Sequence, residues 1–138
     1  MAAAAIPASA ADHGRPHPQP RSHVVLGAIQ YDSPGRENRT NASLNNEWVT
    51  VVNTGRSGVN LTGWTLTNDA RQTYRFTHLW LAGHSSVRVH TGIGHDTAAN
   101  VYQDRRHYVW GNDHDTATLR DNHRHIADSK SWGHRRHR

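Results

Sequence analysis

The residues best suited to chemistry in this chain are arginines that stand beside aromatic side chains. Arg105, Arg106 and His107 lie between Tyr102 and Tyr108. A second basic group ends the chain and consists of Arg135, Arg136 and Arg138. Arginine binds phosphate and carboxylate groups through paired N–H donors, and a neighbouring ring adds a stacking surface. The six basic residues are therefore candidates for an anion-binding site, and the alternative is a solvated basic surface with a frayed tail.

The 13 histidines raise the question of a metal site. His123 and His125 are two residues apart and would share one face of a strand, and His114 lies between Asp113 and Asp115. A metal site needs three or four convergent ligands with supporting hydrogen bonds, and no HExxH or other ordered ligand set occurs. We therefore expect solvated histidines, with no metal site and no cofactor.

Catalysis has little support in the sequence. Cysteine is absent, which excludes a thiolate nucleophile, a structural disulfide and a cysteine-based zinc site. No GxSxG motif occurs. Gly92-Ile93-Gly94 lacks the third glycine of a dinucleotide loop, because Thr97 occupies its place. We expect no catalytic residues and a protein that is not an enzyme, and a hydrolase with an unrecognised site stays open as an alternative.

The five tryptophans divide into candidates for the core and candidates for the surface. Trp64 and Trp110 stand where inward strand residues are expected, so we predict both in the core. Trp80 lies between Leu79 and Leu81, and alternation points its ring away from theirs. We expect Trp80 to pack under a loop. The alternative is an exposed ring that serves as a platform for a sugar or a partner.

The elements that would position these residues are short strands joined by turns rich in Gly, Asn and Asp. About eight strands are indicated by alternating apolar and polar residues between turn signals. They are Val24–Tyr31, Glu47–Asn53, Val59–Leu61, Trp64–Thr67, Thr73–Phe76, Ser86–His90, Thr116–Leu119 and His125–Ala127. Residues 36–46 are expected to form a polar loop, and no segment predicts a convincing helix. Many short strands at this spacing indicate a sandwich or a barrel.

The alternation also assigns side chains to the two faces of each strand. The residues predicted to point inward from the second strand and from Ser86–His90 are Val49, Val51, Val87 and Val89. Arg88 and His90 are predicted to point outward. Gly63 is expected at a bend between two strands.

The two ends of the chain differ from the strand region in composition. Residues 1–11 are apolar and end in Ala8-Ser9-Ala10, which fits a signal-peptidase site, so we interpret them as a signal-peptide remnant whose start lies upstream. Residues 12–22 form a flexible linker rich in Pro, His and Arg. Residues 23–132 form one domain, and residues 133–138 form a basic tail. No apolar run approaches the roughly 18 residues of a membrane span, and we expect a secreted protein.

Several motifs, in order, resemble a known family. Residues 29–35 (IQYDSPG) and 47–55 (EWVTVVNTG) resemble the opening of the lamin-tail domain in its bacterial secreted form. Residues 59–66 (VNLTGWTL) resemble its next strand pair, and residues 86–92 and 109–121 resemble its later strands. The ordered likeness runs from Val24 to Ser129.

This resemblance implies an all-β fold, an immunoglobulin-like β-sandwich of the lamin-tail domain type. In nuclear lamins such a domain is a docking surface for proteins and nucleic acid, and in exported bacterial proteins it has no accepted activity of its own. The resemblance thus implies a non-catalytic binding or accessory module. We expect a monomer without a cofactor that binds an unknown protein or cell-surface partner. A weak nonspecific binder of nucleic acid or of another polyanion, such as an acidic polysaccharide, is the first alternative.

Overall fold

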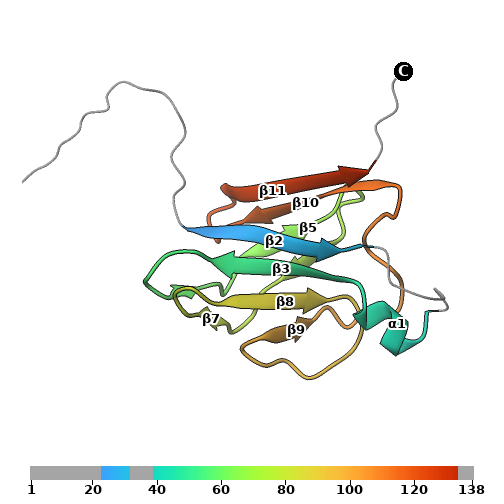
Figure 1. Cartoon of the computed structure of the whole chain (residues 1–138), viewed down its shortest axis with the longest axis horizontal. Helices are drawn as coiled ribbons and strands as arrows, with labels where there is room; N and C mark the ends of the chain where they lie inside the picture. Colours follow the sequence, from blue (N-terminus) through green and yellow to red (C-terminus); the bar gives the residue numbers. More distant parts are fainter. Residues whose placement is uncertain (1–22, 32–38, 134–138) are drawn as a thin grey trace, which may run out of the picture.

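The computed structural model describes residues 23–31 and 39–133 of the 138-residue chain. Within this part, two four-stranded sheets face each other and enclose one hydrophobic core (Figure 1). The arrangement is an immunoglobulin-like β-sandwich, so the predicted fold class is confirmed. The predicted signal remnant at residues 1–11, the linker at 12–22 and all of the basic tail except Gly133 lie outside the described residues.

One sheet has the strand order β2-β3-β8-β9. Its strands are β2 (Val24–Gln30), β3 (Trp48–Asn53), β8 (Ser86–His90) and β9 (Asn100–Tyr102). The first three are antiparallel, and β9 runs parallel to β8. A bulge interrupts β2 between Leu26 and Ile29. At this bulge the edge strand is covered, because Asp128 accepts a hydrogen bond from Leu26 N–H and Lys130 donates one to the Gly27 carbonyl.

The second sheet has the order β11-β10-β5-β6 and is antiparallel throughout. Its strands are β5 (Thr65–Thr67), β6 (Thr73–Arg75), β10 (His114–Arg120) and β11 (Ile126–Gly133). Two shorter strands, β4 (Val59–Asn60) and β7 (Trp80–Leu81), pair with each other. One helix, α1 (Asn41–Asn45), precedes β3. No helix in the described part of the chain is long and apolar enough to cross a bilayer.

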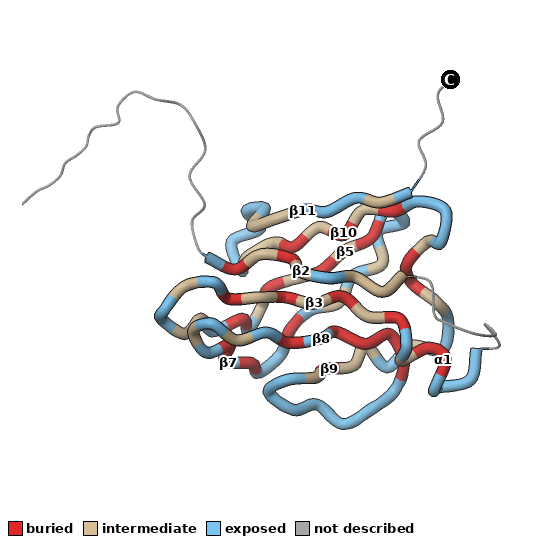
Figure 2. The backbone as a smooth tube through the Cα atoms, in the orientation of Figure 1, coloured by how far each residue is buried: buried red, intermediate tan, exposed pale blue. Residues whose placement is uncertain are grey.

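The core lies between the inner faces of the two sheets, where the buried positions of the strands alternate with exposed ones (Figure 2). One face supplies Val49, Val51, Val87 and Val89, and the other supplies Leu66, Ala117 and Leu119. All seven are at most 1% exposed. Trp64 and Trp110 are 5% and 3% exposed. The predicted inward residues and both predicted core tryptophans are therefore confirmed, as is the bend at Gly63, which has a φ of 89°.

Three elements were not predicted from the sequence, namely α1, β7 and β9. The loop expected over residues 36–46 contains α1, whose N-cap Thr40 accepts a hydrogen bond from Ser43 N–H. His90 points away from the core, as predicted, but it is only 9% exposed, because α1 and β9 cover the outer face of the sheet at this end. His90 Nδ1 lies 2.8 Å from the Asn45 carbonyl oxygen, and its ring stacks on Tyr102 at 4.8 Å between centroids.

Substitution of Trp64 by alanine tests the core. We expect Trp64→Ala to lower the free energy of unfolding by about 3–5 kcal/mol, because it leaves a large cavity between the sheets. The control is Ile126→Ala, which removes a side chain that is 61% exposed and should change stability by no more than about 0.5 kcal/mol. Chemical denaturation measures both variants. Equal midpoints for the two, or a helix-rich circular dichroism spectrum of the wild type, would contradict the sandwich.

Candidate functional site

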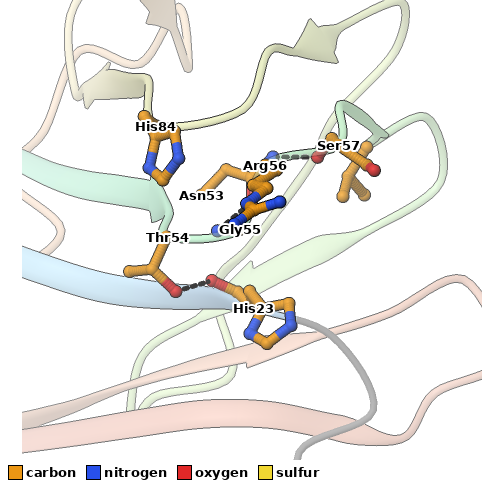
Figure 3. Close-up of a pocket in the computed structure, with 8 residues that line it drawn as sticks. His23, Asn53, Thr54, Gly55, Arg56, Ser57 and His84 are labelled. Atoms are coloured by element: carbon orange, nitrogen blue, oxygen red, sulfur yellow. Dashed lines mark hydrogen bonds between the residues drawn. The ribbon is translucent and has the colours of Figure 1, made fainter.

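An open pocket of about 630 Å³ lies at the end of the sandwich where β2 begins and β3 ends (Figure 3). Its lining consists of His23, Asn53, Thr54, Gly55, Arg56, Ser57, Val59 and His84. These residues come from the start of β2, from the turn between β3 and β4, and from the turn between β7 and β8. We call the space that they surround the His/Arg pocket.

A buried amide sets the shape of the His/Arg pocket. Asn53 is fully buried at the end of β3, and its Nδ2 donates to the carbonyl oxygens of Ser57 at 2.8 Å and Leu81 at 3.1 Å. Its Oδ1 accepts a hydrogen bond from Gly55 N–H at 2.9 Å. One side chain thus holds the turn after β3 against the end of β7, and the core fixes that side chain.

The walls of the pocket are joined through the backbone. The His23 carbonyl accepts hydrogen bonds from both the N–H and the hydroxyl of Thr54, and His84 N–H donates to the Gly55 carbonyl. A side chain at Gly83 would overlap the Arg56 carbonyl, so the two turns can approach this closely only with glycine there. His23 and His84 lie on opposite sides of the turn that carries Arg56 (Figure 3).

The charge of the His/Arg pocket is positive. Its lining contains one arginine and two histidines but no carboxylate. Among the described residues, the one basic side chain within 4 Å of a carboxylate is His125, beside Asp121, so Arg56 has no carboxylate partner there. A guanidinium presents N–H donors in a fork that fits a carboxylate, sulfate or phosphate group. The arrangement therefore suits an anionic ligand.

An exposed tryptophan adjoins this pocket. Trp80 is 62% exposed and pairs with Asn60 across β4 and β7. Its ring rests on Gly58, where a Cβ atom would overlap the indole, and Gly58 lies between Ser57 and Val59 of the pocket lining. The expectation that a loop covers Trp80 is wrong, because its side chain is 62% exposed.

A second pocket, of about 310 Å³, lies on the outer face of the sheet that contains β5, β6 and β10. Its lining consists of Gly63, Thr65, Thr67, Thr73, Arg75, Arg120, Asp121, Asn122 and Arg124, and we call it the arginine groove. The strand register places Arg120 opposite Thr65 and Thr65 opposite Arg75, so the two arginines belong to one row across three strands. Arg75 Nη1 donates to the Gly63 carbonyl at 3.4 Å.

The carboxylate in the arginine groove is held by the turn that carries the paired histidines. Burial acts to raise the pKa of Asp121, but hydrogen bonds from the N–H groups of His125 and His123 and the nearby imidazoles outweigh burial and lower it. The rings of His123 and His125 lie 6.2 Å apart in this turn, before β11 begins. Among the described residues no three His, Asp or Glu side chains converge as metal ligands would.

Of the six predicted anion-binding residues, the structure describes Arg105, Arg106 and His107. Arg105 is half-buried, and its guanidinium donates to Gln103 Oε1 at 3.0 Å and to the Thr73 carbonyl at 3.1 Å. Arg106 and His107 are exposed in the same loop. Arg135, Arg136 and Arg138 lie outside the described residues. Anion binding by this set stays a prediction, and the two pockets above were missed because their residues are distant in sequence.

The buried carboxylates stabilise loops. Glu47 Oε1 accepts hydrogen bonds from the Thr91 hydroxyl at 2.6 Å and from Val109 N–H at 2.9 Å. Asp115 accepts from the N–H groups of Asp69 and Gly111, both at 2.9 Å. Neither carboxylate lines either pocket. These two acidic groups therefore stabilise the fold, and Asp121 in the arginine groove is the one carboxylate that lines either pocket.

A protein-family model described as Lamin Tail Domain matches residues 17–134 of the chain. The matched region contains both sheets, the His/Arg pocket and the arginine groove. A search of the curated proteins finds no match.

The tyrosine beside the Arg105 loop gives a test of the local electrostatics. Burial, together with the carboxylates of Asp96 and Asp104, raises the pKa of Tyr74 to about 12. In the unfolded chain tyrosine ionises near pH 10, so the stability that Tyr74 contributes is complete below about pH 10 and is lost as the pH rises towards 12. Urea denaturation across this pH range should show the loss. Tyr74→Phe is the control and should lack this part of the pH dependence; identical profiles would contradict the assignment.

Proposed function

The chain belongs to the lamin tail domain family, and from this premise we propose that it is an exported, non-catalytic binding module of lamin-tail type. Membership of the family suggests a non-catalytic module with an immunoglobulin-like fold. One observation carries the proposal: the buried carboxylates Glu47 and Asp115 are bonded to backbone N–H groups and line neither pocket. A general base needs a lone pair directed at a substrate, and these two groups direct theirs at loops.

The exposed surface supports binding of a partner that carries negative charge. The His/Arg pocket and the arginine groove present Arg56, Arg75, Arg120 and Arg124, and no arginine in the described ranges is paired with a carboxylate. Complementary charge speeds association and selects partners. The partner in this proposal is therefore a protein or a cell-surface component with an acidic face. Turnover in a panel of nuclease and glycosidase assays with the purified chain would contradict the non-catalytic part.

A second candidate function, weak nonspecific binding of a polyanion such as DNA, is favoured by the arginine groove. Neighbouring strands are about 4.8 Å apart, so Arg75 and Arg120 stand roughly 10 Å apart on a rigid sheet. This spacing suits contacts along an extended anionic chain. The helix α1 has five residues, too few to enter a groove and read base edges, so no sequence preference is expected.

The polyanion candidate predicts a salt-dependent affinity for DNA. Affinity should fall linearly with salt concentration on logarithmic axes, and should be no tighter than about 10⁻⁴–10⁻⁶ M at physiological salt. Arg75→Ala with Arg120→Ala should weaken binding and flatten the slope, because fewer counterions are released. Each single variant, Arg75→Ala or Arg120→Ala, is compared with the single-charge control Arg88→Ala on the other sheet, where the guanidinium lies 4.0 Å from the Trp48 ring centroid.

The sequence-predicted residues are tested in the same gel-shift or fluorescence assay. Arg106→Ala, and truncation after Gly133, measure what the exposed loop and the basic tail contribute. A wild-type chain that fails to bind DNA at low salt removes the polyanion candidate and leaves protein docking.

Export is tested by placing the chain behind an intact upstream signal sequence. We expect the protein in the medium with its N-terminus near Ala11 or Asp12, since Ala8-Ser9-Ala10 fits the small-residue cleavage pattern. Mass spectrometry of the secreted protein locates the terminus. Ala10→Leu is the matched control and should block cleavage at this site. Recovery only from the cytoplasm, with residues 1–11 retained, would contradict export.

A further inference from the structure

We propose that the His/Arg pocket and the exposed ring of Trp80 together bind one unit of an acidic saccharide. The indole packs against the C–H face of the sugar ring, and Arg56 with the two histidines of the pocket binds the carboxylate, sulfate or phosphate group that the sugar carries. The inference rests on the proposed function, a non-catalytic binding module, and names a ligand class for it.

The first support is the state of Trp80. The other four tryptophans are buried or half-buried, whereas Trp80 is 62% exposed. An indole left in water is costly, and exposed aromatic surface often marks a ligand site. The indole packs against Gly58 through Cζ2, Cε2 and Nε1, and the exposed area leaves room for a flat apolar group to stack.

The second support is that the ring and the pocket share one short segment of the chain, residues 57–59. Gly58 lies under the indole, and its two neighbours, Ser57 and Val59, line the pocket. The pocket volume of about 630 Å³ falls within the roughly 300–1,000 Å³ that is usual for small-ligand sites.

The third support is the polar chemistry around the ring. The pocket lining holds Arg56, two histidines and the hydroxyl-bearing Thr54 and Ser57, without a carboxylate to compete for the guanidinium. Across the strand pair from Trp80, Asn60 Oδ1 accepts hydrogen bonds from the hydroxyl and the N–H of Thr62. Its amide nitrogen has no acceptor among the described residues and can donate to a sugar hydroxyl.

A saccharide fits this site better than a nucleic acid does. Single-stranded nucleic acids are bound along basic tracks with several aromatic platforms in succession, because each base needs its own stacking surface. The site here has one aromatic platform, Trp80, and one arginine, Arg56, surrounded by hydroxyl and amide groups. That composition matches a single acidic sugar unit with its hydroxyls.

The experiment titrates the full chain with three oligosaccharides of similar length: an oligogalacturonate, a heparin-derived fragment and a neutral maltooligosaccharide. Tryptophan fluorescence reports on the ring, since Trp80 is the most exposed indole, and calorimetry gives the affinity. We expect saturable binding of an acidic probe, with protection of Trp80 from acrylamide quenching, and no binding of the neutral one. Binding of the oligogalacturonate assigns a carboxylate ligand, and binding of the heparin fragment alone assigns a sulfate.

Matched variants locate the site. Trp80→Ala and Arg56→Ala should each weaken binding about 10-fold or more, as for central contacts of an interface, and Trp80→Phe should retain most of the affinity. Arg88→Ala removes the same charge from a surface outside both pockets, and Ile126→Ala removes another exposed apolar side chain; neither should change the affinity. Thermal melts establish that each variant is folded.

The outcomes separate this inference from the proposed function. If neither acidic probe binds, or if binding survives both Trp80→Ala and Arg56→Ala, the saccharide site is overturned while a binding module with another partner stands. If DNA protects Trp80 from acrylamide quenching, and if DNA binding is lost in Trp80→Ala, nucleic acid is the occupant of the site. The saccharide inference is then overturned as well. Cleavage of a probe during the titration would instead overturn the non-catalytic function.

Discussion

The structure depends on a small core between two sheets that no disulfide reinforces. Hydrophobic residues make up 34% of the chain and cysteine is absent, so packing of the inner faces has to supply most of the stability. Loops then need other anchors, and buried polar side chains provide them: Glu47, Asn53, Asn68 and Asp115. A buried polar group destabilises a fold unless it is hydrogen-bonded. Each of these four meets that condition with at least two bonds, for example from Asn68 Nδ2 to the Val109 carbonyl at 2.7 Å.

Asn53 connects this core to the surface that we assign to binding. It continues the buried positions of β3 beyond Val51, and its amide bonds fix the turn that carries Arg56 and the end of β7 that carries Trp80. The His84 N–H bond to the Gly55 carbonyl adds the third segment. Groups held in place before a ligand arrives lose little freedom on binding, which favours affinity. The pocket is thus organised by the same packing that stabilises the sandwich.

The sequence allowed prediction of those features that depend on local alternation or on ordered motifs. Val49, Val51, Val87 and Val89 could be assigned inward because a strand repeats every two residues, and the family followed from motifs in order. The helix α1 spans five residues, too few for a helical period to appear in the sequence. Its local signal is the N-cap residue Thr40, whose side chain accepts a hydrogen bond from Ser43 N–H three residues later. The two-residue strand β7 and the parallel pairing of β9 leave no local pattern. The His/Arg pocket joins positions 23, 56 and 84, which only tertiary structure brings together.

The place of Trp80 on β7 explains why its exposure is a fixed property of the fold. Leu81, the next residue, is 1% exposed in the core, and alternation along a strand then directs the preceding side chain outward. The ring could be withdrawn only if Leu81 left the core. Because residue 58 is a glycine, no Cβ atom separates the indole from the backbone beneath it, and the ring can pack closely there. A two-residue edge strand is also too short to template pairing with a second chain, so the exposed indole need not promote aggregation. Core packing therefore maintains an oriented aromatic surface next to a basic pocket, which is the arrangement that a stacked and charged ligand requires.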